Sequence, residues 1–211
     1  MKAFTHESGL LVPFYRSNID TDALLPKEYL KKINKIGFGQ YLFDDERYLP
    51  DRTPNPDFVL NQPRYAGAKF LLAGHNFGCG SSREHAVWAL DDYGIRAVIA
   101  PSFGDIFYSN CFKNGLLPAL VSPADADALF ILSEALPPDE ALPLTVDLAQ
   151  QIIIAAGKRF PFQVDEFRRQ ALLQGLDDIG QTLRQAELIR AFEAKRLAAQ
   201  PWLINDPKQK F

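Results

Sequence analysis

The sequence predicts an α/β fold built on a mostly parallel sheet, with an amphipathic helix near its C-terminal end. Short apolar runs alternate with helical segments through the middle of the chain, and glycine or proline marks their ends. The chain has 211 residues, of which 47% are hydrophobic and 23% charged. These are ordinary values for a globular protein, so the composition argues against a disordered chain. A single domain over residues 1–211 is expected at this length.

The first third is expected to be rich in loops, above all at residues 42–58. That stretch mixes acidic residues with Pro50, Pro54 and Pro56. Proline has no N–H group, so it interrupts both helix interiors and strand ladders. We therefore predict a long loop there.

Regular structure is expected to begin after this loop. Three buried strands are predicted at residues 69–73, 96–100 and 116–121, separated by helices at 81–93 and 105–113. Gly94 follows the first of these helices, where glycine commonly ends a helix. Strands that alternate with helices at this spacing form βαβ units, which require a parallel sheet.

The last third changes character. A second strand pair is expected at residues 144–148 and 152–156, and helices are expected from about 165 to 199, with Asp165 as the cap of the first. Apolar residues at helical spacing mark the final amphipathic helix: Leu183, Ala186, Ile189, Phe192 and Leu197. We expect this helix to dock onto its own domain, with binding to a partner as the alternative.

The most informative segment is the glycine-rich loop at residues 73–85, between a predicted strand and a predicted helix. Ser81 followed by Glu84 has the spacing of a capping box, which predicts that the helix begins at Ser81. The N–H groups and the positive dipole end of the helix would then form an anion site. Arg83 at its mouth favours a planar carboxylate.

Other anions fit this loop less well. A Walker-type phosphate loop requires Gly-Lys-Ser/Thr, and a dinucleotide fingerprint requires glycine where Arg83 stands. Ser81, beside an arginine and a helix N-terminus, could exchange a proton with a weak carbon acid. The structural alternative is a well-capped helix whose arginine pairs with a surface carboxylate.

A second candidate segment is Asp20-Thr21-Asp22. Its two carboxylates could bind a metal, form a turn, or hold a catalytic group by hydrogen bonds, and the turn is the favoured interpretation. The two cysteines, Cys79 and Cys111, are too few for a disulfide scaffold or an iron–sulfur cluster held by this chain alone.

Charge and hydropathy limit the partners and the location. The net charge is −3 and the isoelectric point about 5.6, so we expect no nucleic-acid partner. We also expect no membrane association, because no apolar stretch approaches the length of a membrane span. Without a signal-peptide pattern at the N-terminus, a cytoplasmic location is expected.

Six motifs, in this order, give the chain a specific resemblance to a known family. They are NIDTD at 18–22, NPDFVLN at 55–61, NFGCGSSREH at 76–85, APSFGDIF at 100–107, NCFKNGLLP at 110–118 and GLDDIGQTL at 175–183. Together they resemble the bacterial small subunits of 3-isopropylmalate dehydratase, which are the detached swivel domain of the aconitase superfamily.

The resemblance implies a three-layer β/β/α swivel domain and a role in leucine biosynthesis. The reaction it implies is a hydro-lyase isomerisation, in which 2-isopropylmalate is dehydrated and rehydrated as 3-isopropylmalate. It also implies a large subunit that carries a 4Fe-4S cluster, no cofactor bound by this chain, and activity only in the complex.

The resemblance assigns roles to residues of this chain by motif. Ser81 matches the serine that takes the carbon-bound proton, and Thr21 and Asp22 match active-site residues that support hydrogen bonding around the cluster half, Asp22 as a catalytic residue and Thr21 as a substrate-binding one. Ser82 and Arg83 match the groups that hold a substrate carboxylate. Lys31 and Lys32 both stand in the substrate-discriminating stretch, and Lys31 is the expected substrate contact, with Lys32 as the alternative.

Two other functions stay open. The chain could be the small subunit of a related hydro-lyase acting on homoaconitate or citraconate, because the shared motifs do not encode the accepted side chain. A stand-alone anion-binding module, or an RNA-binding regulator, is the alternative from a different class, and the acidic balance disfavours it.

Overall fold

The computed structural model describes residues 1–31, 36–80 and 83–204. The chain divides into two compact units, Met1–Gly175 and Leu176–Phe211. The expectation of one domain over the whole chain stays a prediction.

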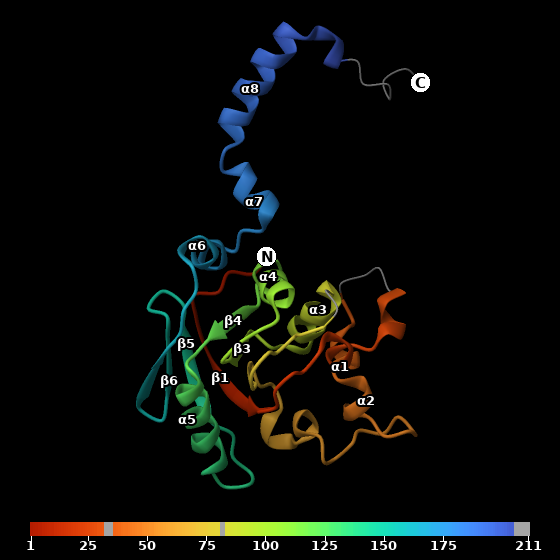
Figure 1. Ribbon diagram of the computed structural model, residues 1–211, viewed down its shortest axis with the longest axis vertical. Helices are drawn as coiled ribbons and strands as arrows, with labels where there is room; N and C mark the ends of the chain where they lie inside the picture. Colours follow the sequence, from red (N-terminus) through yellow and green to blue (C-terminus); the bar gives the residue numbers. More distant parts are fainter. Residues whose placement is uncertain (32–35, 81–82, 205–211) are drawn as a thin grey trace. The chain divides into compact units, whose positions relative to one another are not determined.

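The first unit is built on a seven-stranded sheet in the order β4-β3-β2-β1-β5-β6-β7 (Figure 1). The strands are β1 His6–Pro13, β2 Phe70–Leu72, β3 Ala97–Ala100, β4 Leu117–Leu120, β5 Pro143–Asp147, β6 Ile152–Ala155 and β7 Lys158–Pro161. The five predicted strands are present, whereas β1 and β7 were not predicted. The sequence of β1 contains polar residues and Gly9, which hide its strand character.

Strand β1 joins two different kinds of sheet. It pairs in parallel with β2, with Leu11 opposite Phe70, and β2, β3 and β4 continue in parallel. On its other side it pairs antiparallel with β5, with His6 opposite Asp147, and β6 and β7 continue antiparallel. The α/β class is confirmed, and the parallel part contains four of the seven strands.

Helices cover both faces of the sheet. The first unit contains α1 Thr21–Leu24, α2 Asp44–Arg47, α3 Glu84–Tyr93, α4 Asp105–Asn114, α5 Pro123–Glu134 and α6 Glu166–Gln174. Alternate residues of the parallel strands point to opposite faces, so Leu71 packs in the cluster that contains Leu90 of α3. Leu72 packs in the second cluster with Leu129 of α5 (Figure 1). Because β1, β2, β3 and β4 are parallel, their carboxyl ends lie together at one end of the sheet.

Helix α3 begins later than the sequence predicts. It starts at Glu84, and its cap is Arg83, whose backbone is extended (φ −125°, ψ 117°) and whose side chain makes no capping bond. The Glu84 carboxylate accepts from Asn114 Nδ2 at 2.8 Å and is engaged by α4. The prediction that the helix begins at Ser81 was therefore wrong; Ser81 and Ser82 themselves lie outside the described residues.

The region at residues 42–58 is only partly the loop that was predicted. It opens with the short helix α2, which precedes all three prolines of the region. Four acidic and basic residues in a row form this helix, and Asp44 at its start is buried. The proline argument therefore holds for residues 48–58 and did not apply upstream of them.

Helix α5 is a further element that was not predicted. Ser122 caps it by accepting from Asp125 N at 3.1 Å, and Pro123 stands in its first turn, where a missing N–H costs nothing. A capping serine followed by proline, the usual signals of a helix start, was therefore present in the sequence.

The second unit contains α7 Asp178–Leu183, α8 Ala186–Ala199 and a short 3₁₀ turn, Pro201–Ile204. Asp177 caps α7 by accepting from Gly180 N at 2.7 Å. Helices α6, α7 and α8 lie in the stretch from about 165 to 199 where helices were expected. The apolar side chains Leu188 and Phe192 of α8 are exposed, and docking of this helix stays a prediction.

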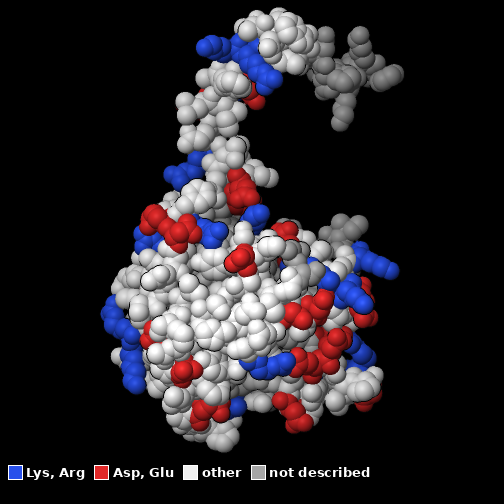
Figure 2. Space-filling view, in the orientation of Figure 1, with Lys and Arg blue, Asp and Glu red and all other residues white. Residues whose placement is uncertain are grey.

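Within the residues that the structure describes, we find no helix long and apolar enough to cross a bilayer. On the face drawn in Figure 2, acidic and basic side chains of the first unit are interspersed, without a broad patch of either sign.

Candidate functional site

The candidate site lies where three parallel strands end. The chain leaves β1, β2 and β3 through residues 14–20, 73–80 and 101–104, and backbone hydrogen bonds join these three segments. Gly78 N donates to Ile19 O at 2.7 Å, and Phe77 N donates to Ser102 O at 3.1 Å. This edge is where α/β sheets usually bind ligands.

Glycine is required in this loop because neighbouring side chains and backbone approach it closely. Gly78 has φ +73°, and a Cβ there would lie 2.2 Å from Cγ of Phe107. A Cβ on Gly104 would lie 2.6 Å from the carbonyl oxygen of Gly78. The loop is therefore packed directly against the start of α4, and its position is fixed.

Asp20 and Asp22 have different roles. Asp20 caps α1, since its carboxylate accepts from Ala23 N at 2.7 Å. The sequence favoured a turn for this segment, whereas the structure uses Asp20 as a helix cap. Asp22 forms an ion pair with Arg83. Two predicted site residues, 61 positions apart in the chain, are thereby brought together.

The exposure of this pair suits an anion site. The Arg83 side chain is 19% exposed and the Asp22 side chain is 55% exposed. Arg83 also stands at the N-terminus of the ten-residue helix α3. The guanidinium is therefore held from one side, is still reachable from solvent, and lies beside the positive end of a helix.

The other predicted residues are placed differently. Thr21 is buried, and its N–H donates to Cys79 O at 3.0 Å, so its backbone ties α1 to the glycine loop. Lys31 is exposed at the end of a 3₁₀ turn, Lys27–Lys31. Ser81, Ser82 and Lys32 are outside the described residues, although Ser82 directly precedes Arg83.

Two asparagines that were not singled out also shape this edge. Asn18 and Asn76 both have left-handed backbones, with φ of 57° and 59°. Asn76 Nδ2 donates to Asn18 Oδ1 at 2.9 Å, and Asn76 N donates to Ser102 Oγ at 2.8 Å. Asparagine tolerates this conformation better than most residues, which is the signal that could have found them.

A small hollow of about 310 Å³ borders the glycine loop. Its walls come from residues 76–80 and from the start of α4, including Ile106 and Phe107. Ile106 is half exposed. Gly80, the last described residue before the gap at 81–82, also lines this hollow.

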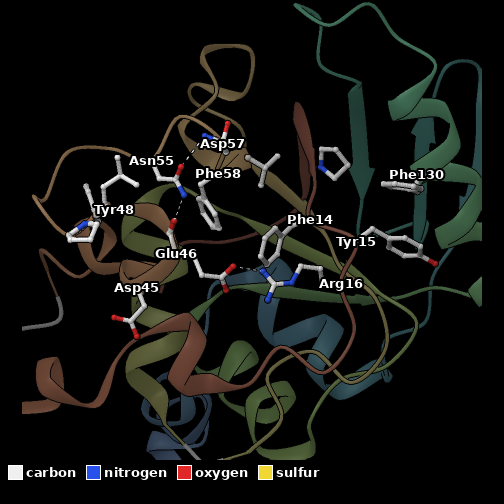
Figure 3. A pocket seen from close by; sticks show the side chains of 14 residues that line it. Phe14, Tyr15, Arg16, Asp45, Glu46, Tyr48, Asn55, Asp57, Phe58 and Phe130 are labelled. Atoms are coloured by element: carbon white, nitrogen blue, oxygen red, sulfur yellow. Dashed lines mark hydrogen bonds and ion pairs between the residues drawn. The ribbon is translucent and has the colours of Figure 1, made fainter.

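A larger hollow of about 740 Å³ lies at the end of β1 (Figure 3). Neither Asp22 nor Arg83 lines it. Phe14, Phe58 and Phe130 supply aromatic walls, while Asp45 and Glu46 of α2 supply carboxylates. It contains none of the predicted site residues. Its size alone therefore does not place the chemistry there.

The cysteines do not fit an iron–sulfur cluster. Cys111 is fully buried in α4, and this burial raises the pKa of its thiol well above the usual value, which disfavours the thiolate that a metal requires. Cys79 lies in the glycine loop. In the described part of the chain, no three His, Cys, Asp or Glu side chains are grouped as metal ligands.

Comparison with known proteins agrees with this geometry. The family of aconitase C-terminal domains matches residues 1–124, and the family of C-terminal domains from 3-isopropylmalate dehydratase small subunits matches residues 178–206. The 3-isopropylmalate dehydratase small subunits of Albidiferax ferrireducens and Delftia acidovorans are 57% and 56% identical to this chain. In both cases the alignment covers 97% of this chain and 98% of the relative.

The chain belongs to the family of 3-isopropylmalate dehydratase small subunits.

A solved structure supports the same assignment. A crystal structure of 3-isopropylmalate dehydratase from Methanocaldococcus jannaschii aligns with a TM-score of 0.64 and 25% identity. It covers 90% of this chain and 99% of that one. The part that matches the aconitase C-terminal domain contains every residue predicted for the dehydratase site, from Thr21 to Arg83. The second match spans α7 and α8.

Proposed function

We propose that this chain is the small subunit of a 3-isopropylmalate dehydratase and forms half of an active site completed by a large subunit. Together they would interconvert 2-isopropylmalate and 3-isopropylmalate by dehydration and rehydration, in leucine biosynthesis. The observation that carries the proposal is the Asp22–Arg83 pair at the start of α3. A cytoplasmic location belongs to the same proposal.

Arg83 is proposed to hold a carboxylate of the hydroxy-acid substrate. Its planar guanidinium can donate two parallel hydrogen bonds to a carboxylate. Asp22 pairs with this guanidinium and limits the rotamers of the Arg83 side chain. Ser82 and Thr21 are proposed to support binding of the same carboxylate, and Lys31 to bind a second part of the substrate.

Ser81 is proposed to take and return the carbon-bound proton, with Asp22 supporting the arrangement. A proton next to a carboxylate is very weakly acidic, so its removal requires a base already placed and positive charge beside the developing enolate. Arg83 and the N-terminus of α3 supply that charge.

The large subunit is proposed to hold a 4Fe-4S cluster, since the cysteines of this chain do not fit one. Its binding surface is proposed to be the edge that carries Arg83, because the substrate must reach both chains at once. The substrate class is a small hydroxy dicarboxylate with a branched alkyl group.

The test is Ser81→Ala in the complex with the large subunit. We expect the complex to form normally and turnover of 3-isopropylmalate to fall by about 100-fold or more, as is typical when a positioned acid–base group is removed. Ser8→Ala is the control, because Ser8 lies in β1 and bonds Thr145 Oγ1 at 2.8 Å. Full activity of the Ser81 variant would exclude the catalytic role.

The choice of substrate is tested with the same complex. Relative rates on isopropylmalate, homoaconitate and citraconate distinguish the three hydro-lyase activities. Titration with RNA at physiological salt, in the absence of the large subunit, tests the regulatory alternative.

A further inference from the structure

The turn that carries Lys31 is held by a tyrosine. Tyr29 stands in the middle of the Lys27–Lys31 turn. Its ring stacks on Tyr41, with ring centres 4.0 Å apart and planes at 19°. Its hydroxyl donates to Asp44 Oδ2 at 2.9 Å. Burial and the bond to Asp44 raise the pKa of Tyr29, so this hydroxyl keeps its proton throughout the physiological range.

The acceptor of that hydrogen bond is itself fixed. The Asp44 side chain is only 6% exposed. Arg52 binds it with both terminal nitrogens, Nη1 to Oδ2 at 2.7 Å and Nη2 to Oδ1 at 2.9 Å. Two parallel bonds leave the carboxylate a single orientation. Asp44 is therefore a rigid point to which the turn is attached.

Helix α2, which carries Asp44, also contacts the segment that follows β1. Glu46 and Arg16 point toward one another and form an ion pair (Figure 3). The Arg16 carbonyl accepts from Gly74 N at 2.9 Å, in the loop after β2. The four-residue helix α2 therefore connects the turn to the strand edge on which the candidate site stands.

The chain beyond the turn returns to helix α3. Asp92 Oδ2 accepts from Gly37 N at 3.0 Å and from Gly39 N at 2.7 Å. The ring of Phe38 meets His85 edge-on at 5.5 Å, two residues after Arg83. The turn follows α1, which carries Asp22, and the returning chain contacts α3 beside Arg83.

We propose that Asp44 is a positioning residue that sets the place of the Lys27–Lys31 turn, through Tyr29, for binding of the substrate. The inference rests on the proposed function, because it assumes that Lys31 contacts the hydroxy dicarboxylate. Asp44 touches no substrate in this arrangement. It acts by keeping the turn in one position, so its loss lowers the fraction of molecules ready to bind.

The test compares Tyr29→Phe and Asp44→Asn in the complex with the large subunit. Phenylalanine keeps the ring on Tyr41 and removes only the hydroxyl. Asparagine keeps an acceptor oxygen and loses the charge that Arg52 requires. We expect KM for 3-isopropylmalate to rise roughly 3- to 10-fold, with kcat changed less than about 2-fold. Backbone hydrogen exchange at residues 27–31 should become faster in both variants.

Tyr93→Phe is the matched control. The Tyr93 hydroxyl donates to Leu60 O at 3.0 Å, so this variant loses a similar hydrogen bond that does not touch the turn. We expect its KM and its exchange at residues 27–31 to match those of the wild type. An equal rise of KM in Tyr29→Phe and Tyr93→Phe, or an unchanged KM in Tyr29→Phe, would overturn the proposal.

The two proposals fail differently. If the wild-type complex does not turn over isopropylmalate, the proposed function is wrong, and the claim that Asp44 serves substrate binding is overturned with it. If the wild-type complex is active but exchange at residues 27–31 is unchanged in Asp44→Asn, only the role of Asp44 is wrong. Should Asp44→Asn fail to fold, Tyr29→Phe decides alone.

Discussion

At the scale of single residues, Arg83 combines two properties that the sequence suggested as alternatives. It pairs with a partly exposed carboxylate, as an ordinary surface arginine would. That carboxylate belongs to Asp22, a residue assigned to the site by motif resemblance. An exposed pair contributes at most about 1 kcal/mol to stability. Its orienting effect on the guanidinium is therefore the better reason for its presence.

We predict that Arg83→Lys lowers kcat/KM for 3-isopropylmalate by roughly 10- to 100-fold. Lysine keeps the positive charge but cannot donate two parallel hydrogen bonds to a carboxylate. The thermal midpoint should change little, because the pair is partly exposed. Steady-state kinetics of the complex and thermal unfolding of the isolated chain test the two parts. Wild-type kcat/KM in this variant would show that Arg83 does not bind the substrate in the bidentate way.

At the scale of elements, the strand-edge loop depends on glycine for space as well as for backbone conformation. Gly78 and Gly157 have nearly the same φ, +73° and +74°. Only Gly78 is crowded, because a Cβ there would collide with Phe107, whereas nothing lies within 4 Å at Gly157. Alanine at Gly157 would therefore suffer backbone strain alone, whereas alanine at Gly78 would suffer the same strain and a steric collision.

We predict that Gly157→Ala destabilises the fold by about 1 kcal/mol, the cost of a left-handed alanine. Gly78→Ala should cost about 3 kcal/mol or more, because the collision adds to the same strain. Urea unfolding of the two variants measures the difference. Equal losses would mean that the loop can move away from α4 at no cost.

A charged cluster fastens the start of β1 to its neighbours. Glu7 pairs with Lys69 at 2.9 Å and lies 3.7 Å from Arg96, whose side chain is 8% exposed. Burial by itself raises the pKa of Glu7. The hydrogen bond from Lys69 and the charges of Lys69, Lys2 and Arg96 outweigh it and lower the pKa below 4.5. The ionised form is thus preferred in the folded state.

We predict that the stability due to Glu7 is fully present at neutral pH and is lost as the pH falls below about 4.5 and through the lowered folded pKa. Glu7→Gln should lower the free energy of unfolding by roughly 1 kcal/mol at pH 7, and should not change it at a pH below the folded pKa of Glu7. Urea unfolding of both proteins at several pH values checks this. A constant difference across the range would contradict the assigned pKa shift.

At the scale of the whole molecule, the hydrophobic core belongs to the first unit. Every member of the two buried clusters lies between Met1 and Leu173. Gly175 ends α6, and its carbonyl accepts from the N-terminal amine at 3.2 Å. The second unit contributes no buried residue through α7 or α8.

We predict that a chain ending at Gly175 folds cooperatively with a midpoint within about 4 °C of the full chain, because its core is complete. Thermal unfolding by circular dichroism tests this. A broad or absent transition would show that the second unit contributes to the core of the first. Binding of the large subunit by the shortened chain tests separately whether α8 is needed for the complex.

The sequence determined the α/β class, five of the seven strands, and the glycine loop with Arg83, because each depends on local composition and spacing. The structure begins α3 at Glu84, later than the capping-box spacing predicts, and the carboxylate of Glu84 accepts a hydrogen bond from Asn114 of α4, a contact that local spacing does not encode. The tertiary structure alone decided that Asp22 meets Arg83 and that Asp44 holds Tyr29. Such contacts arise from the packing of segments that are distant in the chain, so local sequence propensity does not predict them.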